Sequence, residues 1–226
     1  MIKDEILQDI QVRQDSFECS VTADIAVFGY VGGKLKILLI KRSFGFYKNH
    51  WHIPGGVMEE EETIEDCAAK VLFALTGFRD VHFEQVNTYT TLDRHPLKRV
   101  ITICFYALVK PENHPLTLKG NVTNIEWFDL DNLPGKFAYD HEKLVNDAYT
   151  FVRNNLKHKL IVGELLPKKF TLQELQNLYE DILDVKLDRR NFRKQIFHMD
   201  VLENTGKKKK GVRGGPFLYQ LKAAER

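Results

Sequence analysis

The sequence predicts an α/β (α+β) protein in which a mixed-sheet domain is followed by a small helical domain that ends in a β-hairpin. Runs of β-branched and aromatic residues with hairpin spacing dominate the chain up to about residue 130. Two amphipathic helical segments interrupt and close this region, as expected for helices packed on a sheet. After Leu166-Pro167 the pattern changes to two short helices and a hairpin rich in glycine and lysine.

The predicted strands begin with a hairpin. Residues 21–30 and 34–41 are apolar runs, and Val31-Gly32-Gly33 between them supplies the residues that a tight turn requires. The run at 98–109 is apolar along most of its length, which is typical of a buried strand. Two shorter runs predict strands at 82–91 and 123–128.

Four segments have helical patterns. Residues 62–76 place apolar residues on one face, with an acidic first turn and Gly77 just past the end, and residues 140–157 form a second amphipathic helix. A capping box at 171–174 begins a helix to about 182, and Asp188 can cap another to about 199. Two short helices joined by a tight turn and followed by a hairpin are the outline of a winged helix-turn-helix.

Three parts of the chain follow from these elements. We predict an N-terminal helical segment over 1–19, a sheet domain over 20–157, and a winged helix-turn-helix domain over 160–226. Composition excludes other classes, because no run approaches the roughly 20 apolar residues that span a bilayer and the acidic start is unlike a signal peptide. We expect a cytoplasmic protein with no membrane partner.

The cysteines and charges narrow the function further. Cys19, Cys67 and Cys104 lie far apart without a C-x-x-C pair, which argues against a disulfide framework or a zinc site. The net charge of +2 conceals an asymmetry: from Lys157 onward there are 16 Lys and Arg against 9 Asp and Glu, whereas the preceding residues hold 17 against 22. A basic segment of this kind favours a polyanionic partner.

One segment keeps the spacing of a catalytic motif but lacks its acidic residues. It reads Gly56-x5-Glu62-x7-Lys70-Val71-Leu72-Phe73-Ala74-Leu75-Thr76-Gly77-Phe78. It resembles the Nudix box, G-x5-E-x7-R-E-U-x-E-E-x-G-U, where U is a bulky aliphatic residue. Flanking family features are also present, Trp51-His-Ile-Pro-Gly-Gly56 before the box and 125–134 near the end. The resemblance implies a Nudix fold over about residues 20–157.

The absence of the Nudix-box glutamates argues against hydrolysis. In Nudix enzymes they bind a divalent metal that activates the attacking water. Here Val71, Ala74 and Leu75 stand at those positions, and Lys70 replaces the arginine. We therefore expect no catalytic residues, no metal site, no cofactor and no hydrolysis. The alternative is an enzyme with a displaced metal site built from residues 59–62, which otherwise form a solvated helix entrance.

Candidate DNA-binding residues gather in the last domain. Nine cationic side chains within 25 residues suit the phosphates of double-stranded DNA, and arginines on a helix can reach guanine edges. The alternatives are a solvated lysine run and a protein that coats nucleic acid without sequence preference. The helix contributes Arg189, Arg190, Arg193 and Lys194, and the hairpin contributes Lys207, Lys208, Lys209, Lys210 and Arg213.

In this order, the segments resemble the Nudix-related transcriptional regulators over nearly the whole chain. The most specific part is the phrase FTLQELQNLYE at 170–180 followed by LDRRNFRK at 187–194. The resemblance implies a homodimeric repressor or activator whose Nudix domain senses a small metabolite. We expect such a dimer to bind a palindromic operator, because one small winged helix makes few base contacts and two-fold symmetry doubles them. Members respond to ADP-ribose or, in a sugar-utilisation branch, to a pentose such as L-arabinose.

Candidate effector-binding residues are Asp24, Lys41, Trp51 and His52. Asp24 lies inside an apolar strand, where a buried carboxylate needs donors such as sugar hydroxyls, and Trp51 and His52 can line the same cavity. The structural alternatives are a carboxylate paired with Lys41, a lysine in a salt bridge, and ordinary core packing. Because the metal-binding glutamates are absent, the sequence favours a sugar, namely L-arabinose, over ADP-ribose.

Overall fold

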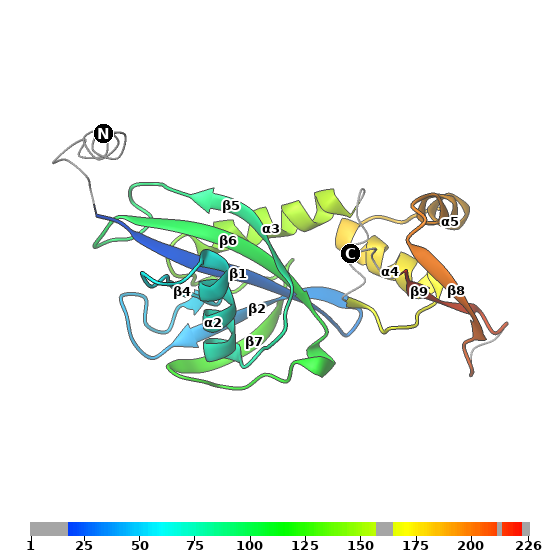
Figure 1. Cartoon of the computed structure of the whole chain (residues 1–226), viewed down its shortest axis with the longest axis horizontal. Helices are drawn as coiled ribbons and strands as arrows, with labels where there is room; N and C mark the ends of the chain where they lie inside the picture. Colours follow the sequence, from blue (N-terminus) through cyan, green and yellow to red (C-terminus); the bar gives the residue numbers. More distant parts are fainter. Residues whose placement is uncertain (1–17, 157–164, 212–213, 223–226) are drawn as a thin grey trace, which may run out of the picture.

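The structure, a computed structural model, describes residues 18–156, 165–211 and 214–222 and arranges them as two domains along its long axis (Figure 1). The first domain is a mixed β-sheet with a helix on each face. Its elements are β1 (Ser20–Val31), β2 (Lys34–Arg42), β3 (Trp51–His52), β4 (Gly55–Val57), α2 (Ile64–Thr76), β5 (Phe83–Tyr89), β6 (Val100–Val109), the 3-10 helix η1 (Pro111–Asn113), β7 (Val122–Asp129) and α3 (His141–Asn155).

The sheet is built around β1. Its strand order is β3-β2-β1-β6-β5, with β4 paired to β1 and β7 paired to β2. Because β1 runs parallel to β6 and antiparallel to β2, the sheet is mixed. The β1–β2 hairpin turns at Gly32 and Gly33, whose φ values of 61° and 83° are the left-handed values that a two-residue turn of this kind requires.

The two faces of the sheet carry separate hydrophobic cores. One core lies under α2, where the apolar face of the helix meets the sheet. The other lies under α3 and continues without a break into the next domain, so that Leu144 and Leu175 belong to one apolar cluster. This shared core holds the two domains against each other.

The second domain has the order helix, turn, helix and hairpin. α4 starts at a capping box in which Thr171 and Glu174 satisfy each other's backbone N–H groups, and α5 starts at Asp188, whose carboxylate caps the first turn. Phe170 extends the hairpin through a short bridge to Tyr219. The elements are α4 (Leu172–Leu183), α5 (Arg189–His198), β8 (Leu202–Lys208) and β9 (Phe217–Leu221).

The fold class predicted from the sequence is confirmed. The predicted strands and helices agree with the structure to within two residues at each end. The sequence does not predict β3 and β4, because runs of two and three residues show no periodicity. The N-terminal helix and the limits between domains remain predictions, since residues 1–17 and 157–164 lie outside the described part. Every helix in that part is too short or too polar to cross a bilayer.

Replacing Thr171 by alanine removes the hydroxyl that caps α4 and leaves the Glu174 N–H without its partner. We expect the free energy of unfolding to fall by about 1 kcal/mol. Urea denaturation followed by circular dichroism measures this change. Thr117→Ala, at an exposed loop position, is the matched control and should change it by less than about 0.5 kcal/mol. Equal losses in the two variants would show that the capping box does not stabilise the domain.

Candidate functional site

Helix α2 carries the Nudix-box positions, and apolar side chains fill the places of the three glutamates. Val71 and Leu75 are buried in the core, and Ala74 faces solvent. None of these side chains can ligate a cation. In the part of the chain that the structure describes, no group of three or more His, Cys, Asp or Glu side chains is placed to hold a metal ion.

A lysine neutralises the acidic residues that remain at the start of α2. Lys70 Nζ lies 2.7 Å from Glu62 Oε2 and 3.0 Å from Glu59 Oε1. Glu62 also accepts a hydrogen bond of 2.7 Å from the backbone N–H of Glu59. The ammonium group lies between the two carboxylates, where a displaced metal ion would have to bind.

A cavity of about 130 Å³ opens beside the Pro-Gly-Gly segment that precedes the box. The two glycines let β4 approach its neighbours closely. A Cβ on Gly55 would lie 1.7 Å from Asp24 Oδ1, and a Cβ on Gly56 would lie 2.8 Å from Val71 Cγ2. The polar side chains of the lining are Thr22, Asp24, Arg42, His52, Arg94, His95, Lys98, Tyr139 and His141.

Asp24 is the buried carboxylate of this cavity. Thr22 Oγ1 lies 3.4 Å from its Oδ2, and His141 Nε2 lies 3.9 Å from its Oδ1. Burial raises the pKa of Asp24 from 3.8 to about 6, although the charges of Arg94 and Arg42 and a hydrogen bond from Thr102 lower it. Its ionised form is therefore costly, and its cationic neighbours partly offset that cost.

Arg94 is the most deeply buried cation of the lining. Its Nη2 donates to Asp140 Oδ1 at 2.7 Å and its Nε donates to Asp140 Oδ2 at 3.2 Å, which is a two-point ion pair. Its Nη1 donates to Thr102 Oγ1. These bonds fix the guanidinium at the edge of the cavity and connect it to the residue just before α3.

Arg42 and Lys98 add two further positive charges to the lining. Arg42 donates from Nη2 to the Gly55 carbonyl, while its buried Nε has no hydrogen-bond partner. Lys98 is exposed at the rim and donates to Ser20 Oγ at 2.9 Å. With Arg94, the lining has three cations and one carboxylate. Such a lining suits an anionic ligand better than a neutral one.

Two neutral histidines complete the polar lining. Burial lowers the pKa of both His52 and His141 to about 3. His141 Nδ1 accepts a hydrogen bond of 3.2 Å from the Ile53 N–H, so its proton is on Nε2, which faces Asp24. His52 Nε2 lies 3.3 Å from the Tyr47 carbonyl and donates to it.

Tyr139 forms one wall of the cavity in an unusual backbone conformation. Its φ of 51° is in the left-handed region, which costs a residue with a Cβ and is common at functional sites. Its ring stacks on His95 with centroids 5.3 Å apart and meets Tyr47 edge-on at 4.6 Å. Tyr139 and His95 thus provide the aromatic surface that the sequence assigns to Trp51.

Lys41 and Trp51 do not line this cavity, so the expectation that all four candidate residues share one site is corrected. Trp51 packs edge-on against Phe128 in the core, with ring centroids 4.6 Å apart. Lys41 Nζ lies 4.4 Å from the indole centroid, and the two residues face each other in the β2–β3 ladder. Adjacent residues of a strand point to opposite sides, so Arg42 and His52 reach the cavity instead.

Sequence reasoning missed most of the polar side chains of this lining: Thr22, Arg42, Arg94, His95, Lys98, Tyr139 and His141. They come from separate segments that only the folded sheet brings together. The one local signal is Arg42, a second cation directly after Lys41 at the end of an apolar strand. When the register of a strand is unknown, the residue next to a predicted binding residue is an equally good candidate, because neighbouring residues point to opposite faces of the sheet.

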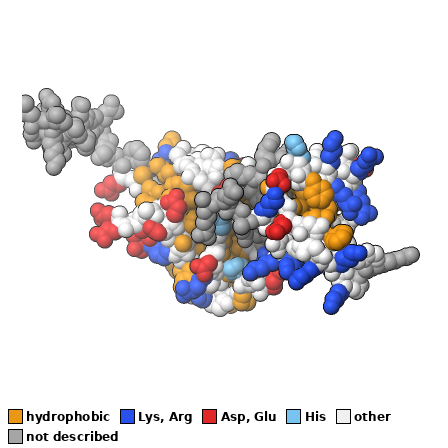
Figure 2. Space-filling view, turned by 45° about the vertical axis from the view of Figure 1, so that its right-hand side comes forward, with side chains coloured by type: hydrophobic (Ala, Val, Ile, Leu, Met, Phe, Trp, Pro, Cys, Tyr) orange, Lys and Arg blue, Asp and Glu red, His pale blue; other side chains and the backbone are white. Residues whose placement is uncertain are grey.

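The recognition surface on α5 agrees with the predicted placement of its cations. Phe192 and Ile196 are buried and fix the inner face of the helix. Arg190 and Lys194, four residues apart, lie on the opposite face. Figure 2 shows Lys and Arg side chains gathered over this domain and Asp and Glu side chains over the other. All four predicted cations of α5, Arg189, Arg190, Arg193 and Lys194, are exposed.

The hairpin lysines differ in their surroundings. Lys207 and Lys208 belong to β8 rather than to the tip, and with Lys210 they are exposed. Lys209 instead turns back to α4, where its Nζ lies 2.6 Å from Glu174 Oε1. Arg213 lies outside the described residues. The exposed lysines are available to phosphates, whereas Lys209 ties the hairpin to the helix that precedes the turn.

Comparison with known proteins covers both domains. A model of the NUDIX domain matches residues 21–148, and a model of the NrtR DNA-binding winged helix domain matches residues 162–221. The ADPR responsive transcriptional repressor NtrR of Acinetobacter baylyi is 32% identical over 204 residues, 89% of this chain and 81% of that protein. The ADP-ribose pyrophosphatase of Methanocaldococcus jannaschii is 35% identical over 123 residues, 54% of this chain and 71% of that enzyme.

Solved structures agree with this assignment. Shewanella oneidensis NrtR complexed with a 27mer DNA is similar over 89% of this chain and 93% of that chain, with a TM-score of 0.79 and 29% identity. The NUDIX domain of the same protein complexed with ADP ribose matches 67% of this chain and 99% of that chain, with a TM-score of 0.57 and 25% identity. Fold and site define a Nudix domain joined to a DNA-binding winged helix. The chain belongs to the family of Nudix-related transcriptional regulators that includes NrtR.

The buried Asp24 makes stability depend on pH in a defined direction. Its pKa is about 6 when folded and 3.8 ordinarily, so between about pH 4 and pH 6 the folded protein keeps a proton that the unfolded chain has lost. Stability therefore falls as pH rises through this window, by about 3 kcal/mol in total. In Asp24→Asn this contribution is absent. The variant should gain stability relative to the wild type by that amount between about pH 4 and pH 7.

Urea denaturation of both proteins across this range measures the difference. His52 and His141, whose pKa falls from 6.5 to about 3 on folding, destabilise the fold as pH decreases below 6.5, but both proteins contain them, and to first order they cancel. Asp93→Asn, at an exposed loop position, is the control and should differ from the wild type by a constant amount. A constant difference for Asp24→Asn as well would contradict the assignment.

Proposed function

We propose that the protein is a transcriptional repressor that binds operator DNA through α5 and the hairpin and releases it when ADP-ribose enters the Nudix cavity. One observation carries the proposal: an exposed cationic helix is joined to a domain whose cavity is lined by Arg42, Arg94 and Lys98. The helix suits the phosphates of DNA, and the cavity suits a small anion. A repressor acts where operator DNA lies, in the cytoplasm.

The proposed effector is ADP-ribose rather than the L-arabinose that the sequence favoured. A diphosphate bound without a metal needs several Arg or Lys side chains, and the cavity supplies three. A neutral pentose would offer no negative charge to these cations, of which Arg94 is already paired with Asp140. Two relatives support this choice: the regulator of Acinetobacter baylyi is an ADPR responsive repressor, and the NUDIX domain of Shewanella oneidensis NrtR forms a complex with ADP ribose.

The size of the cavity limits how ADP-ribose can bind. Its volume of about 130 Å³ lies below the roughly 300–1,000 Å³ of sites for drug-sized ligands. In this arrangement only the diphosphate and a neighbouring ribose fit among the cations. The exposed side of Lys98 and the stacked pair of Tyr139 and His95 border the opening, where the rest of the ligand would lie.

ADP-ribose should be bound without being hydrolysed. The likeness to a pyrophosphatase extends over 54% of this chain, yet Val71, Ala74 and Leu75 replace the metal ligands of the box. Lys70 holds Glu59 and Glu62, which further disfavours a displaced metal site. The protein would thus lack the hydrolytic activity of Nudix enzymes but keep their ligand pocket, so that ADP-ribose is bound without being destroyed.

The proposed DNA-binding form is a homodimer on a palindromic operator. A single small winged helix contacts few bases, and two-fold protein symmetry doubles the number. Arg190 and Lys194 face outward on α5 and are the residues placed to reach base edges. The exposed hairpin lysines are placed for phosphates, which position the protein without reading sequence.

Replacing Lys98 by alanine removes one cation from the rim of the cavity. We expect ADP-ribose affinity to fall about tenfold, because a hydrogen bond to a charged group contributes about 1.5–3 kcal/mol. Lys41→Ala is the matched control: it removes the same charge from the same domain, but its ammonium lies over Trp51. Isothermal titration calorimetry should show less than a twofold change for that control and no binding of L-arabinose by the wild type. Binding of L-arabinose with no heat from ADP-ribose would refute the proposed effector.

For DNA binding, the probe is a duplex selected by the wild-type protein from a random library. Arg190→Ala should weaken specific binding by about 1–3 kcal/mol if the side chain contacts a base. Lys207→Ala should mainly lower the salt dependence, reducing the slope of log K against log salt by about one. Lys143→Ala, in the Nudix domain, is the control.

Fluorescence anisotropy over a range of salt concentrations separates these effects. Unchanged affinity in the Arg190→Ala, Arg193→Ala double variant would show that another face of the domain meets the DNA. Failure of the library to yield any preferred duplex would favour a protein that coats nucleic acid without sequence preference.

A further inference from the structure

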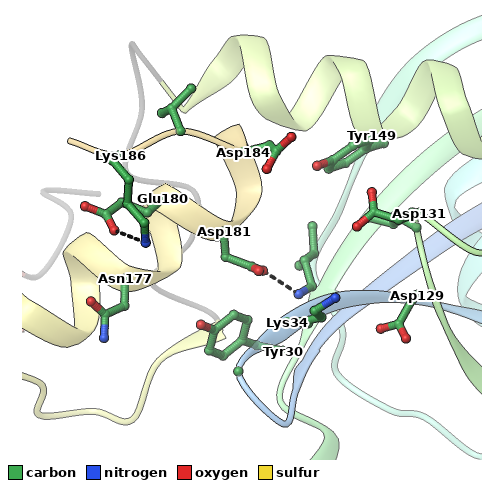
Figure 3. Close-up of a pocket in the computed structure, with 14 residues that line it drawn as sticks. Tyr30, Lys34, Asp129, Asp131, Tyr149, Asn177, Glu180, Asp181, Asp184 and Lys186 are labelled. Atoms are coloured by element: carbon green, nitrogen blue, oxygen red, sulfur yellow. Dashed lines mark hydrogen bonds and ion pairs between the residues drawn. The ribbon is translucent and has the colours of Figure 1, made fainter.

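A second and larger cavity, of about 680 Å³, lies between the two domains. Figure 3 shows α3 on one side, α4 on the other, and the β1–β2 hairpin at its edge. Asp129 and Asp131 come from the Nudix domain, and Asp181 and Asp184 come from α4. Lys34 and Lys186 belong to the same lining, and Asp129 is paired with Lys36 at 3.2 Å, so charges of both signs meet at this boundary.

Among the described residues, three side-chain hydrogen bonds join the Nudix domain to the last turn of α4. The Leu35 N–H donates to Asp181 Oδ2 at 2.7 Å. Tyr149 Oη donates to the Ile182 carbonyl at 2.9 Å, and Arg153 Nη2 donates to the Leu183 carbonyl at 2.7 Å. We call Asp181, Tyr149 and Arg153 the clasp.

The backbone groups in these bonds are ones that α4 and the β2–β7 ladder leave without a hydrogen bond: the carbonyls of Ile182 and Leu183 and the N–H of Leu35. α4 ends at Asp184, which adopts a left-handed φ of 53° and whose N–H bonds back to the carbonyls of residues 180 and 181. The next two carbonyls of the helix are left over, as at any helix C-terminus, and the Nudix domain supplies their donors. Likewise β7 ends opposite Lys36, so no β7 residue stands opposite Leu35 and its N–H is taken by Asp181.

One helix connects the clasp with the effector cavity. α3 begins at His141, which lines that cavity, directly after Asp140, which is paired with Arg94. At 1.5 Å per residue, Tyr149 and Arg153 lie about 12 and 18 Å further along the same rigid element. A ligand that moves Arg94 or His141 therefore also moves the donors that hold α4.

On the other side, α4 determines where the recognition helix lies. The Tyr179 ring meets the Phe192 ring of α5 edge-on, with centroids 5.3 Å apart. Gln176 Nε2 donates to the Leu187 carbonyl at 2.9 Å and thereby fixes the turn that leads into α5. A shift of the last turn of α4 is thus transmitted to the cationic face of α5.

We propose that Tyr149, Arg153 and Asp181 are positioning residues that couple the effector cavity to the DNA-binding surface by setting the orientation of α4 on the Nudix domain. The inference rests on the proposed function, since it names how that site is regulated. The shared apolar core holds the domains together, and the three hydrogen bonds of the clasp set the orientation of the last turn of α4 on that core. A small displacement of α3 is therefore enough to change it.

The coupling is tested by measuring affinity for the selected duplex with and without saturating ADP-ribose in the full chain. Anisotropy gives the ratio of the two dissociation constants, which for allosteric proteins is typically about 5–150. We expect ADP-ribose to have a much smaller effect on DNA affinity in the Tyr149→Phe, Arg153→Met double variant and in Asp181→Ala. In both, the ratio of the two dissociation constants should be at least fivefold lower than in the wild type, or close to one. Calorimetry should show ADP-ribose affinity within about threefold of the wild type. Asp181→Asn retains an acceptor for the Leu35 N–H and should keep the wild-type ratio.

Asp184→Asn is the matched control, because it removes a carboxylate of the same cavity that is not part of the clasp, and asparagine tolerates the left-handed backbone at this position. It too should keep the wild-type ratio. A wild-type ratio in the double variant, with ADP-ribose still bound, would overturn the coupling role even if stability were lower.

A second readout separates this proposal from the proposed function. Hydrogen exchange of the Leu35 amide, followed by NMR without any ligand, should be at least about tenfold faster in Asp181→Ala than in Asp184→Asn. Equal rates would overturn the clasp itself. ADP-ribose is the wrong effector if it leaves the DNA affinity of the wild type unchanged while the Leu35 amide exchanges as slowly as expected. The hydrogen bond between Leu35 and Asp181 would be confirmed by that slow exchange.

Discussion

The rest of the structure depends on the burial of β1 on both faces. Residues 23–29 are buried without interruption, with α2 over one face and α3 over the other. A strand in that position has no room for an unsatisfied polar group, yet it contains Asp24. Gly55 gives the carboxylate space, and Arg42, Arg94 and His141 surround it, so the requirements of one buried charge assemble the lining of the cavity.

The same constraint explains how the site differs from that of a hydrolase. A diphosphate can be neutralised by a divalent metal on glutamates or by guanidinium and ammonium groups. In this chain the first solution is replaced by core packing of Val71 and Leu75, and the second is supplied by Arg42, Arg94 and Lys98. Metal activation of water is lost with the glutamates, whereas cations alone still bind an anion. The proposed loss of hydrolysis and retention of ligand binding follow from the use of cationic side chains in place of a metal ion.

Local patterns in the sequence were sufficient for the fold. Periodicity and caps predict α2, α3, α4 and α5, because each helix carries its own apolar face and end signals. The cavity required information that lies between segments. Asp24 was found since a carboxylate in an apolar strand is locally anomalous, but Arg94 and Lys98 are ordinary loop residues until β6 carries that loop beside β1. The sequence places Lys41 and Trp51 in the cavity because register cannot be read from one strand. It favours a sugar because the metal-binding glutamates are absent, while the cations that replace them as partners of an anion come from other segments.

The central claim is that the cavity binds ADP-ribose intact and that this binding opposes DNA binding. Calorimetric titration of ADP-ribose into the protein with Mg²⁺, alone and with the selected duplex, tests it most directly, since linkage requires both ligands to weaken each other by one factor. We expect ADP-ribose to bind at least fivefold more weakly to the DNA complex and to be recovered unchanged afterwards. Equal affinity in the two titrations, or recovery of hydrolysed products, would contradict it.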